Sequence, residues 1–169
     1  MKITVTVGDV LTAQADALIS TANPWLNMSG GVNGAILASA GGETIQAELK
    51  AYLQKLGRAS VPPGTVVVTS AGPLEYEKII HAVAIDPFYD SSVDLVATTL
   101  KAALKASFEL GAHSVAMPTL ATGYGPLTIR QFAQALFHAS SHAEHLERFQ
   151  VVVRSEQNAV DIRDVLTGN

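Results

Sequence analysis

Residues 16–37, DALISTANPWLNMSGGVNGAIL, place a short apolar run, a loop rich in small residues and the start of a helical pattern in succession. Residues 17–20 have the apolar character of a strand that is covered on both faces. The loop continues to Gly34, and the helical pattern begins at Ala35. A buried strand that leads through a glycine loop into a helix is typical of α/β proteins with a largely parallel sheet.

The rest of the chain repeats this alternation, because the hydrophobic period switches between about 2 and about 3.6. We predict strands at residues 3–7, 17–20, 65–70, 79–84, 114–118 and 149–153. Apolar stripes predict further helices at residues 45–56, 96–108, 129–137 and 159–166, and glycines follow the first two, at Gly57 and Gly111. The pattern therefore indicates a largely parallel sheet between layers of helices.

Composition limits the classes of function. The 169 residues are 48% hydrophobic and 15% charged, with a net charge of −4, which is expected of a single domain spanning residues 1–169. The absence of Cys excludes disulfides, thiolate metal sites and a Cys nucleophile. The acidic balance argues against nucleic acid as a partner. No window approaches the roughly 18 apolar residues of a membrane span, so we expect no membrane contact and a cytoplasmic protein.

Two loops of small residues follow predicted strands, at residues 21–34 and 119–126. In open α/β sheets, ligands bind beyond the carboxyl ends of the strands. A loop that opens a helix leaves backbone N–H groups without partners at the positive end of the helix dipole, which favours phosphate. Two such loops suit a diphosphate; the alternative is that the glycines serve only tight turns. Neither loop has the pattern of a Walker or a dinucleotide-binding motif.

Seven segments together resemble one family. They are residues 8–10 (GDV), 16–23 (DALISTAN), 29–36 (SGGVNGAI), 66–69 (VVVT), 79–83 (IIHAV), 114–118 (SVAMP) and 121–125 (ATGYG). In this order and at these separations they resemble the macrodomains, which bind ADP-ribose. The resemblance implies a three-layer α/β/α sandwich with a mixed, mostly parallel six-stranded sheet. It also implies a binding cleft at the carboxyl end of that sheet.

The resemblance further implies roles for particular residues. Asp9 would accept a hydrogen bond from the adenine amino group, assisted by the backbone of Val10, and Asn23 would hold the distal ribose. The implied diphosphate and ribose contacts are Ser29, Gly30, Gly31, Val32 and Asn33 in the first loop and Ala121, Thr122, Gly123, Tyr124 and Gly125 in the second. Alternatives remain open: Asp9 as a turn residue, Asn23 in an Asx turn, and Tyr124 as a packing residue. The resemblance implies no cofactor and no metal; the expected partner is ADP-ribose, a related small molecule or an ADP-ribosylated protein.

The departures from the family pattern bear on catalysis. Ser20 and Ser29 stand where the family has Asn and Gly, and the second loop is one residue shorter than the commoner pattern. Asn33 stands where the hydrolytic members have an Asp, and an amide cannot act as a general base at neutral pH. The main hypothesis is therefore an ADP-ribose binder. The alternatives are an ADP-ribosyl hydrolase or O-acetyl-ADP-ribose deacetylase that uses a diphosphate oxygen as base, and a protein-interaction domain with a degenerate cleft.

Other polar and aromatic residues have two interpretations each. His138, His142 and His145 fall at i, i+4 and i+7 of a predicted helix, as metal ligands or as a solvated helix end. His81 lies in a core strand, where a packed and hydrogen-bonded histidine is expected. We predict that the loop at residues 86–90 borders the cleft. Phe88 in this loop and Arg154 are candidates for contact with adenine, while Arg154 also fits a surface residue beside Glu156.

Overall fold

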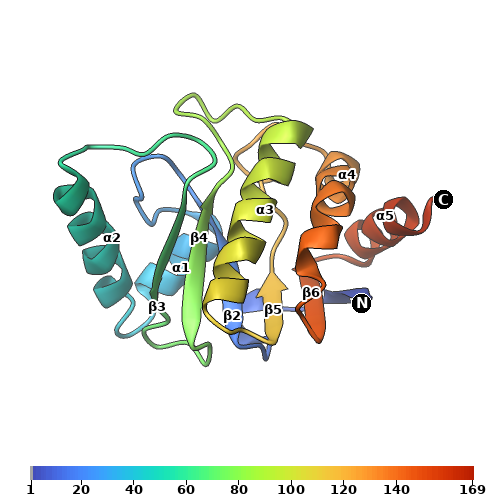
Figure 1. The fold of residues 1–169 in the computed structure, drawn as a ribbon, viewed down its shortest axis with the longest axis horizontal. Helices are drawn as coiled ribbons and strands as arrows, with labels where there is room; N and C mark the ends of the chain where they lie inside the picture. The colour runs from blue at the N-terminus through green and yellow to red at the C-terminus, as the bar shows by residue number, and fades with distance from the viewer. Residues whose placement is uncertain (1) are drawn as a thin grey trace.

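The structure is a computed structural model that describes residues 2–169, over which strands and helices alternate (Figure 1). The strands are β1 (Ile3–Val7), β2 (Ala17–Ala22), β3 (Val66–Ser70), β4 (Lys78–Val83), β5 (Ser114–Met117) and β6 (Arg148–Val153). The helices are α1 (Gly31–Ala38), α2 (Glu43–Leu56), α3 (Val93–Glu109), α4 (Ile129–Ala139) and α5 (Glu156–Thr167), with short 3-10 helices η1 (Val10–Thr12) and η2 (Ser140–Ala143).

The sheet of these described residues has six strands in the order β1-β6-β5-β2-β4-β3. All neighbouring strands run parallel except β3, which pairs antiparallel with β4. The prediction of a mixed, mostly parallel sheet is therefore confirmed. Because five strands run the same way, their carboxyl ends meet at one edge, where a ligand site is expected.

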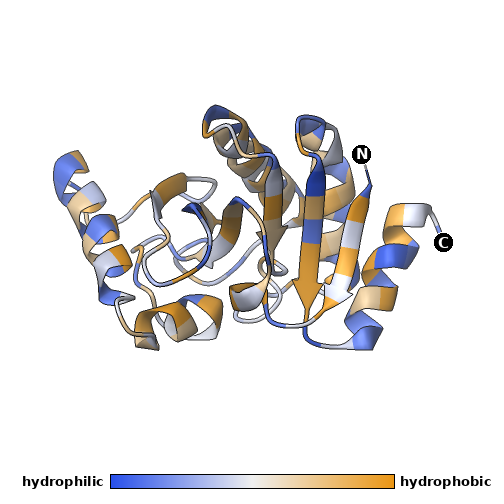
Figure 2. Ribbon diagram, turned by 90° about the horizontal axis from the view of Figure 1, so that it is seen from below, coloured by the Kyte–Doolittle hydropathy of each residue, from blue (hydrophilic) through white to orange (hydrophobic). Residues whose placement is uncertain are grey.

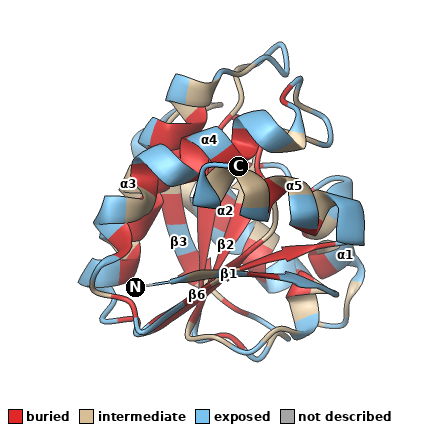
Figure 3. Cartoon of the chain, turned by 90° about the vertical axis from the view of Figure 1, so that its right-hand side faces the viewer, coloured by how far each residue is buried: buried red, intermediate tan, exposed pale blue. Residues whose placement is uncertain are grey.

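Helices cover both faces of the sheet. Alternate strand residues point to opposite faces, so Ile19 and Ile80 pack in one apolar cluster and Leu18 and Ile79 in the other. The first cluster lies under α3, α4 and α5, and the second lies under α1 and α2. Buried residues run through the strands and along the sheet-facing sides of α3 and α4 (Figure 3). The predicted three-layer sandwich is thereby confirmed.

The helix patterns show the amphipathic character that the sequence predicts. Hydrophobic and hydrophilic residues alternate around α2 and α5, whereas hydrophobic residues dominate several strands (Figure 2). Helix α2 ends at Gly57, whose φ of 65° is the left-handed conformation that glycine adopts without strain. Helix α1 begins at Gly31, four residues before the predicted start at Ala35, because Gly30 with a φ of 65° turns the chain directly into the helix.

The length and hydropathy of the helices were compared with those of a membrane span. Across residues 2–169, no helix combines the length and the apolar character that crossing a membrane requires.

Candidate functional site

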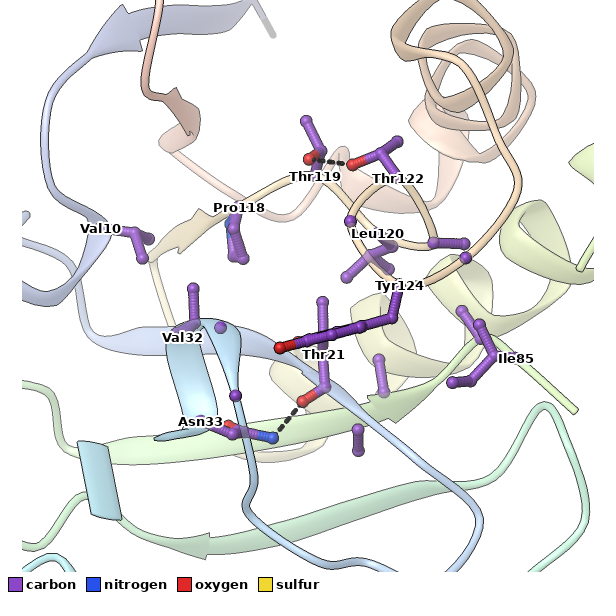
Figure 4. A pocket seen from close by; sticks show the side chains of 18 of the residues that line it. Val10, Thr21, Val32, Asn33, Ile85, Pro118, Thr119, Leu120, Thr122 and Tyr124 are labelled. Atoms are coloured by element: carbon purple, nitrogen blue, oxygen red, sulfur yellow. Dashed lines mark hydrogen bonds between the residues drawn. The ribbon is translucent and has the colours of Figure 1, made fainter. Parts of the chain in front are cut away.

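A cleft of about 430 Å³ opens at the carboxyl edge of the sheet (Figure 4). Its walls are the segment at residues 23–31, here called the glycine loop, and the segment at residues 118–126, here called the second loop. The residues predicted for the site that line it are Val10, Asn23, Ser29, Gly30, Gly31, Val32, Asn33, Ala121, Thr122, Gly123, Tyr124 and Gly125. The structure thus brings together all the predicted residues except Asp9, and their contact with a ligand stays a prediction.

The glycine loop presents unpaired backbone N–H groups at the start of α1. Gly30 and Gly31 have φ values of 65° and 55°, which glycine adopts readily and other residues rarely do. The hydrogen bonds within residues 2–169 include none from the N–H groups of Gly31, Val32 or Asn33. These are the donors that every α-helix leaves free at its first turn, and together with the helix dipole they favour an anion.

Contacts from behind hold the glycine loop in place. The Asn23 Oδ1 atom accepts hydrogen bonds from the N–H of Trp25 at 3.1 Å and of Asn27 at 3.2 Å. The Gln46 side chain of α2 accepts from the N–H of Met28 at 2.7 Å and donates to the carbonyl of Leu26 at 2.9 Å. The Asx turn considered for Asn23 is therefore present, and the loop is fixed before any ligand arrives.

The second loop is tied by its own hydrogen bonds. The hydroxyl oxygens of Thr119 and Thr122 lie 2.6 Å apart, and the N–H of Leu127 donates to the carbonyl of Ala121 at 3.0 Å. A Cβ atom on Gly125 would lie 2.5 Å from that same carbonyl oxygen, so the turn requires glycine there. The N–H groups of residues 122–125 have no acceptor within the described part of the chain, and they are available to a ligand.

Tyr124 extends from the second loop toward the glycine loop. Its ring reaches across the cleft, with the hydroxyl toward Val32 (Figure 4). A Cβ atom built on Gly30 would overlap the Tyr124 hydroxyl group, which shows how closely the two loops approach. Tyr124 is 71% exposed, so it is not a core packing residue.

Asp9 and Arg154 lie at the β1 and β6 end of the cleft. Asp9 Oδ1 accepts a hydrogen bond from the N–H of Leu11 at 2.9 Å, which makes Asp9 the cap of η1 as well as a candidate for ligand contact. The Arg154 Nη2 atom lies 3.8 Å from this carboxylate. Arg154 lines the cleft, and it does not pair with Glu156, whose partner is Arg163 at 3.1 Å. Arg154 is a surface residue, as the second interpretation has it, because its side chain is 74% exposed, and its contact with adenine stays a prediction.

Asn33 is buried, and both of its polar atoms already have protein partners. The Ser20 hydroxyl donates to Asn33 Oδ1 at 2.8 Å, and Asn33 Nδ2 donates to the carbonyl of Thr21. The short Ser20 side chain, one of the departures from the family pattern, thus contacts Asn33, another of them. The pair fastens α1 to the end of β2.

The loop after β4 borders the cleft as expected, but through a different aromatic residue. Phe88 is 89% exposed and does not line the cleft, so its predicted contact with adenine is not supported by its position. Its neighbour Tyr89 lines the cleft instead. Sequence reasoning also missed Asn27 and Asn158, which line the cleft and whose polar side chains carry no distinguishing local pattern.

His81 is fully buried in β4 and confirmed as a packed, hydrogen-bonded residue. Its Nε2 atom lies 2.9 Å from the hydroxyl oxygen of Thr69, and its Nδ1 atom has no partner among the described residues. Burial lowers the pKa of His81 to about 4, because the charged imidazolium loses its hydration. The side chain is therefore neutral at physiological pH.

The three histidines near the end of α4 do not share one helix face. Helix α4 ends at Ala139, so only His138 lies in it, while His142 lies in η2. His145 is drawn away to α3, where its Nε2 atom lies 2.9 Å from the Ser107 hydroxyl oxygen. The assumption of a continuous helix was wrong. Among residues 2–169, no group of three or more His, Cys, Asp or Glu residues is placed to hold a metal ion.

The chain matches the family model of the Macro domain over residues 19–136. The chain belongs to the macro domain family. A curated protein of Pyrobaculum aerophilum with no described function is 35% identical and covers 89% of this chain and 82% of its own length. An O-acetyl-ADP-ribose deacetylase of Klebsiella pneumoniae is 39% identical over 72% of this chain and 69% of its own length.

A solved structure shows the same macrodomain fold. A glycine-to-valine mutant of the Oceanobacillus iheyensis macrodomain with ADPR superposes with a TM-score of 0.84 at 26% identity, covering 97% of this chain and 91% of that one. The macrodomain resemblance that the sequence motifs carry is confirmed by this match and by the family model.

Proposed function

We propose that this macrodomain binds ADP-ribose or an ADP-ribose derivative in the cleft. The observation that carries the proposal is the pair of loops with free backbone N–H groups, which face each other across one open cleft. Diphosphate is the ligand group that two such loops suit best. The Oceanobacillus iheyensis relative was solved with ADPR, which supports the proposal for this chain.

The diphosphate is proposed to lie between the two loops. Neither residues 23–31 nor residues 118–126 contain a Lys or Arg, so backbone N–H groups and the dipole of α1 supply the attraction. The proposed donors are in Gly30, Gly31 and Val32 on one side and Thr122, Gly123, Tyr124 and Gly125 on the other, with Ala121 supporting the turn. The N–H of Ser29 already donates to the carbonyl of Asn27 at 3.0 Å, so Ser29 is proposed to shape the loop beside the ligand. Because this attraction is dipolar and local, the affinity is expected to vary little with salt.

The two ends of the ligand are proposed to lie at opposite ends of the cleft. The Asp9 carboxylate is 42% exposed and retains acceptor capacity for the adenine amino group, next to the backbone of Val10. Asn23 and Asn33 lie at the start of the glycine loop and of α1, where the distal ribose would be held, with Tyr124 over it. Val10 is itself fixed from behind, because its carbonyl accepts a hydrogen bond from the Tyr76 hydroxyl.

Isothermal titration calorimetry with ADP-ribose, ADP and AMP tests the proposal. We expect ADP-ribose to bind more tightly than ADP, and ADP more tightly than AMP, because each step removes a group that the cleft would hold. Gly30→Val should change the affinity for ADP-ribose, since Gly30 has a positive φ and its added side chain would lie against Tyr124. Gly111→Val is the matched control, because Gly111 also has a positive φ, 73°, but lies away from the cleft. Absence of binding at millimolar ADP-ribose would refute the proposal.

Hydrolysis of an ADP-ribose ester is a second candidate, favoured by the 39% identity to the Klebsiella pneumoniae deacetylase. Asn33 cannot remove a proton from water, so the reaction would depend on a diphosphate oxygen of the substrate as base. Release of acetate from O-acetyl-ADP-ribose above the buffer rate, abolished by Asn23→Ala, would establish it. The third hypothesis, a degenerate cleft, required side chains to fill the site, and the open cleft of about 430 Å³ counts against it.

A further inference from the structure

Three aromatic side chains from three different segments form a row at one end of the cleft. The ring centroids of Trp25 and Tyr89 are 6.3 Å apart, and those of Tyr89 and Tyr124 are 6.4 Å apart. We call these three residues the aromatic rim. Their exposed fractions are 41%, 42% and 71%, so each ring keeps much of its surface in solvent. Large aromatic groups gathered and exposed beside a cleft are a feature of binding surfaces.

The backbone of residues 86–90 holds Tyr89 in this row. The Asp86 carboxylate accepts hydrogen bonds from the N–H of Phe88 at 2.8 Å and of Asp90 at 2.9 Å, and the N–H of Asp86 donates to the carbonyl of Asp90 at 2.9 Å. Tyr89 has a φ of 62°, which costs a non-glycine residue roughly 1 kcal/mol. The turn therefore fixes an exposed aromatic ring in place before a ligand arrives.

The segments that carry the aromatic rim contain negative charges and no positive ones. The three segments that carry the rim, residues 22–31, 84–94 and 118–128, contain no Lys or Arg. Residues 84–94 contain three carboxylates, Asp86, Asp90 and Asp94. The faces of Trp and Tyr rings attract cations, most often a guanidinium group, which also stacks on them. The same surface repels the phosphates of a nucleic acid, since no basic residue of these segments would neutralise them.

The position of the aromatic rim relates it to the distal end of the ligand. Asp9 and Arg154 lie at the β1 and β6 end of the cleft, whereas Tyr89 follows β4 and Trp25 follows β2. If adenine lies by Asp9, as proposed above, the distal ribose extends toward the rim. A group attached to the distal ribose would then leave the cleft at the aromatic rim.

We propose that the aromatic rim binds the side chain of an arginine that flanks the modified residue of an ADP-ribosylated polypeptide. This inference rests on the proposed function and names its substrate class. The guanidinium stacks on the rim and is attracted by the carboxylates of residues 86–94, while the attached ADP-ribose occupies the cleft. Free ADP-ribose does not reach beyond the distal ribose and makes no use of this surface.

Calorimetry with two synthetic peptides tests the inference. Both carry ADP-ribose on the same serine; one has arginine next to it, and the other has citrulline, which is planar and of similar shape but uncharged. We expect the arginine peptide to bind about three- to tenfold more tightly. Trp25→Leu should remove this difference. Because Trp25 belongs to the glycine loop, the readout is the ratio of the two peptide affinities, which a uniform change in ADP-ribose affinity does not alter. Asp90→Asn, which keeps an acceptor for the N–H of Ser91, should reduce the difference.

Phe88→Leu is the matched control, since Phe88 lies on the same turn but outside the aromatic rim; it should keep the full difference. Retained binding of free ADP-ribose shows that each variant is folded. Equal affinities of the two peptides for the native chain would overturn the inference. A difference between the peptides that survives in Trp25→Leu would also overturn it. Tighter binding of an ADP-ribosylated oligonucleotide than of the arginine peptide would also overturn it. Failure to bind free ADP-ribose would instead refute the proposed function.

Discussion

Replacing Asn33 with Asp tests how the start of α1 is fastened to the sheet. In the native chain, Asn33 Nδ2 donates to the carbonyl of Thr21, and Asn33 is only 6% exposed. A carboxylate at this position has no proton to donate, so two acceptors face each other in a buried place. Leaving a buried acceptor without its donor costs about 1–3 kcal/mol. The negative charge in the first turn of α1 stabilises the folded state by about 0.3–1 kcal/mol through the helix dipole.

The expected net effect of Asn33→Asp is a loss of about 1–2 kcal/mol in the free energy of unfolding at pH 7.5, or about 2–8 °C in Tm. The loss should depend on pH. Burial raises the pKa of the introduced carboxyl above its unfolded value of about 3.9, so the protonated form is favoured in the folded state. The loss in the free energy of unfolding is therefore smallest near pH 4, where the protonated acid donates to the carbonyl of Thr21 as the amide does. The loss grows as the pH rises.

Thermal unfolding of the native chain and of Asn33→Asp at pH 4.5 and pH 7.5 measures this difference, from which the titration of all other groups cancels. Ser20→Ala is the matched control. It removes the hydrogen bond from Ser20 to Asn33 but leaves the bond to Thr21, so its cost of about 1 kcal/mol should not change with pH. An Asn33→Asp protein as stable as the native chain at pH 7.5, or a penalty equal at both pH values, would refute this reasoning.

Three further predictions concern the sheet and the two loops. Since the folded pKa of His81 is about 4, below its unfolded value of about 6.5, its contribution to stability is complete above pH 6.5 and falls as the pH drops through 4. Between pH 7 and pH 4, the free energy of unfolding from denaturant titrations should fall by about 3 kcal/mol less in His81→Gln than in the native chain. Gly125→Ala should weaken ADP-ribose binding and cost about 1–3 kcal/mol in thermal unfolding, whereas Gly123→Ala, with open space around it, should leave the stability unchanged. Gln46→Ala should cost about 2 kcal/mol and lower ADP-ribose affinity in calorimetry, because it releases the glycine loop; unchanged affinity would show that α2 does not hold that loop.

The parts of the fold that the sequence predicts are those with local signals. Short apolar runs located every strand, and apolar stripes located α2 to α5, because burial on one or both faces imposes a period on neighbouring residues. The exact ends were less predictable. Strand β2 continues to Ala22, two residues beyond the predicted end, since its pairing with β4 extends to Val83 regardless of the polar side chains at residues 20–21.

The parts of the site that the sequence did not predict depend on contacts between distant segments. Nothing near Gln46 in the sequence indicates that it holds the glycine loop from α2. In the same way, Trp25, Tyr89 and Tyr124 come from segments that only the order of the strands brings together. The predicted histidine face failed for the reverse reason, because Ser107 and Phe108 of α3 draw His145 away from the end of α4.

Two of the departures from the family pattern, Ser20 and Asn33, are best understood together. Asn33 has a donor where an Asp has none, and that donor binds the carbonyl of Thr21, while the short Ser20 leaves room for its hydroxyl to reach the amide oxygen. The pair anchors the helix whose free N–H groups face the cleft. An amide in this position gives up the general base and gains a rigid, uncharged support for the proposed diphosphate site, which favours retaining the proposed ligand over hydrolysing it.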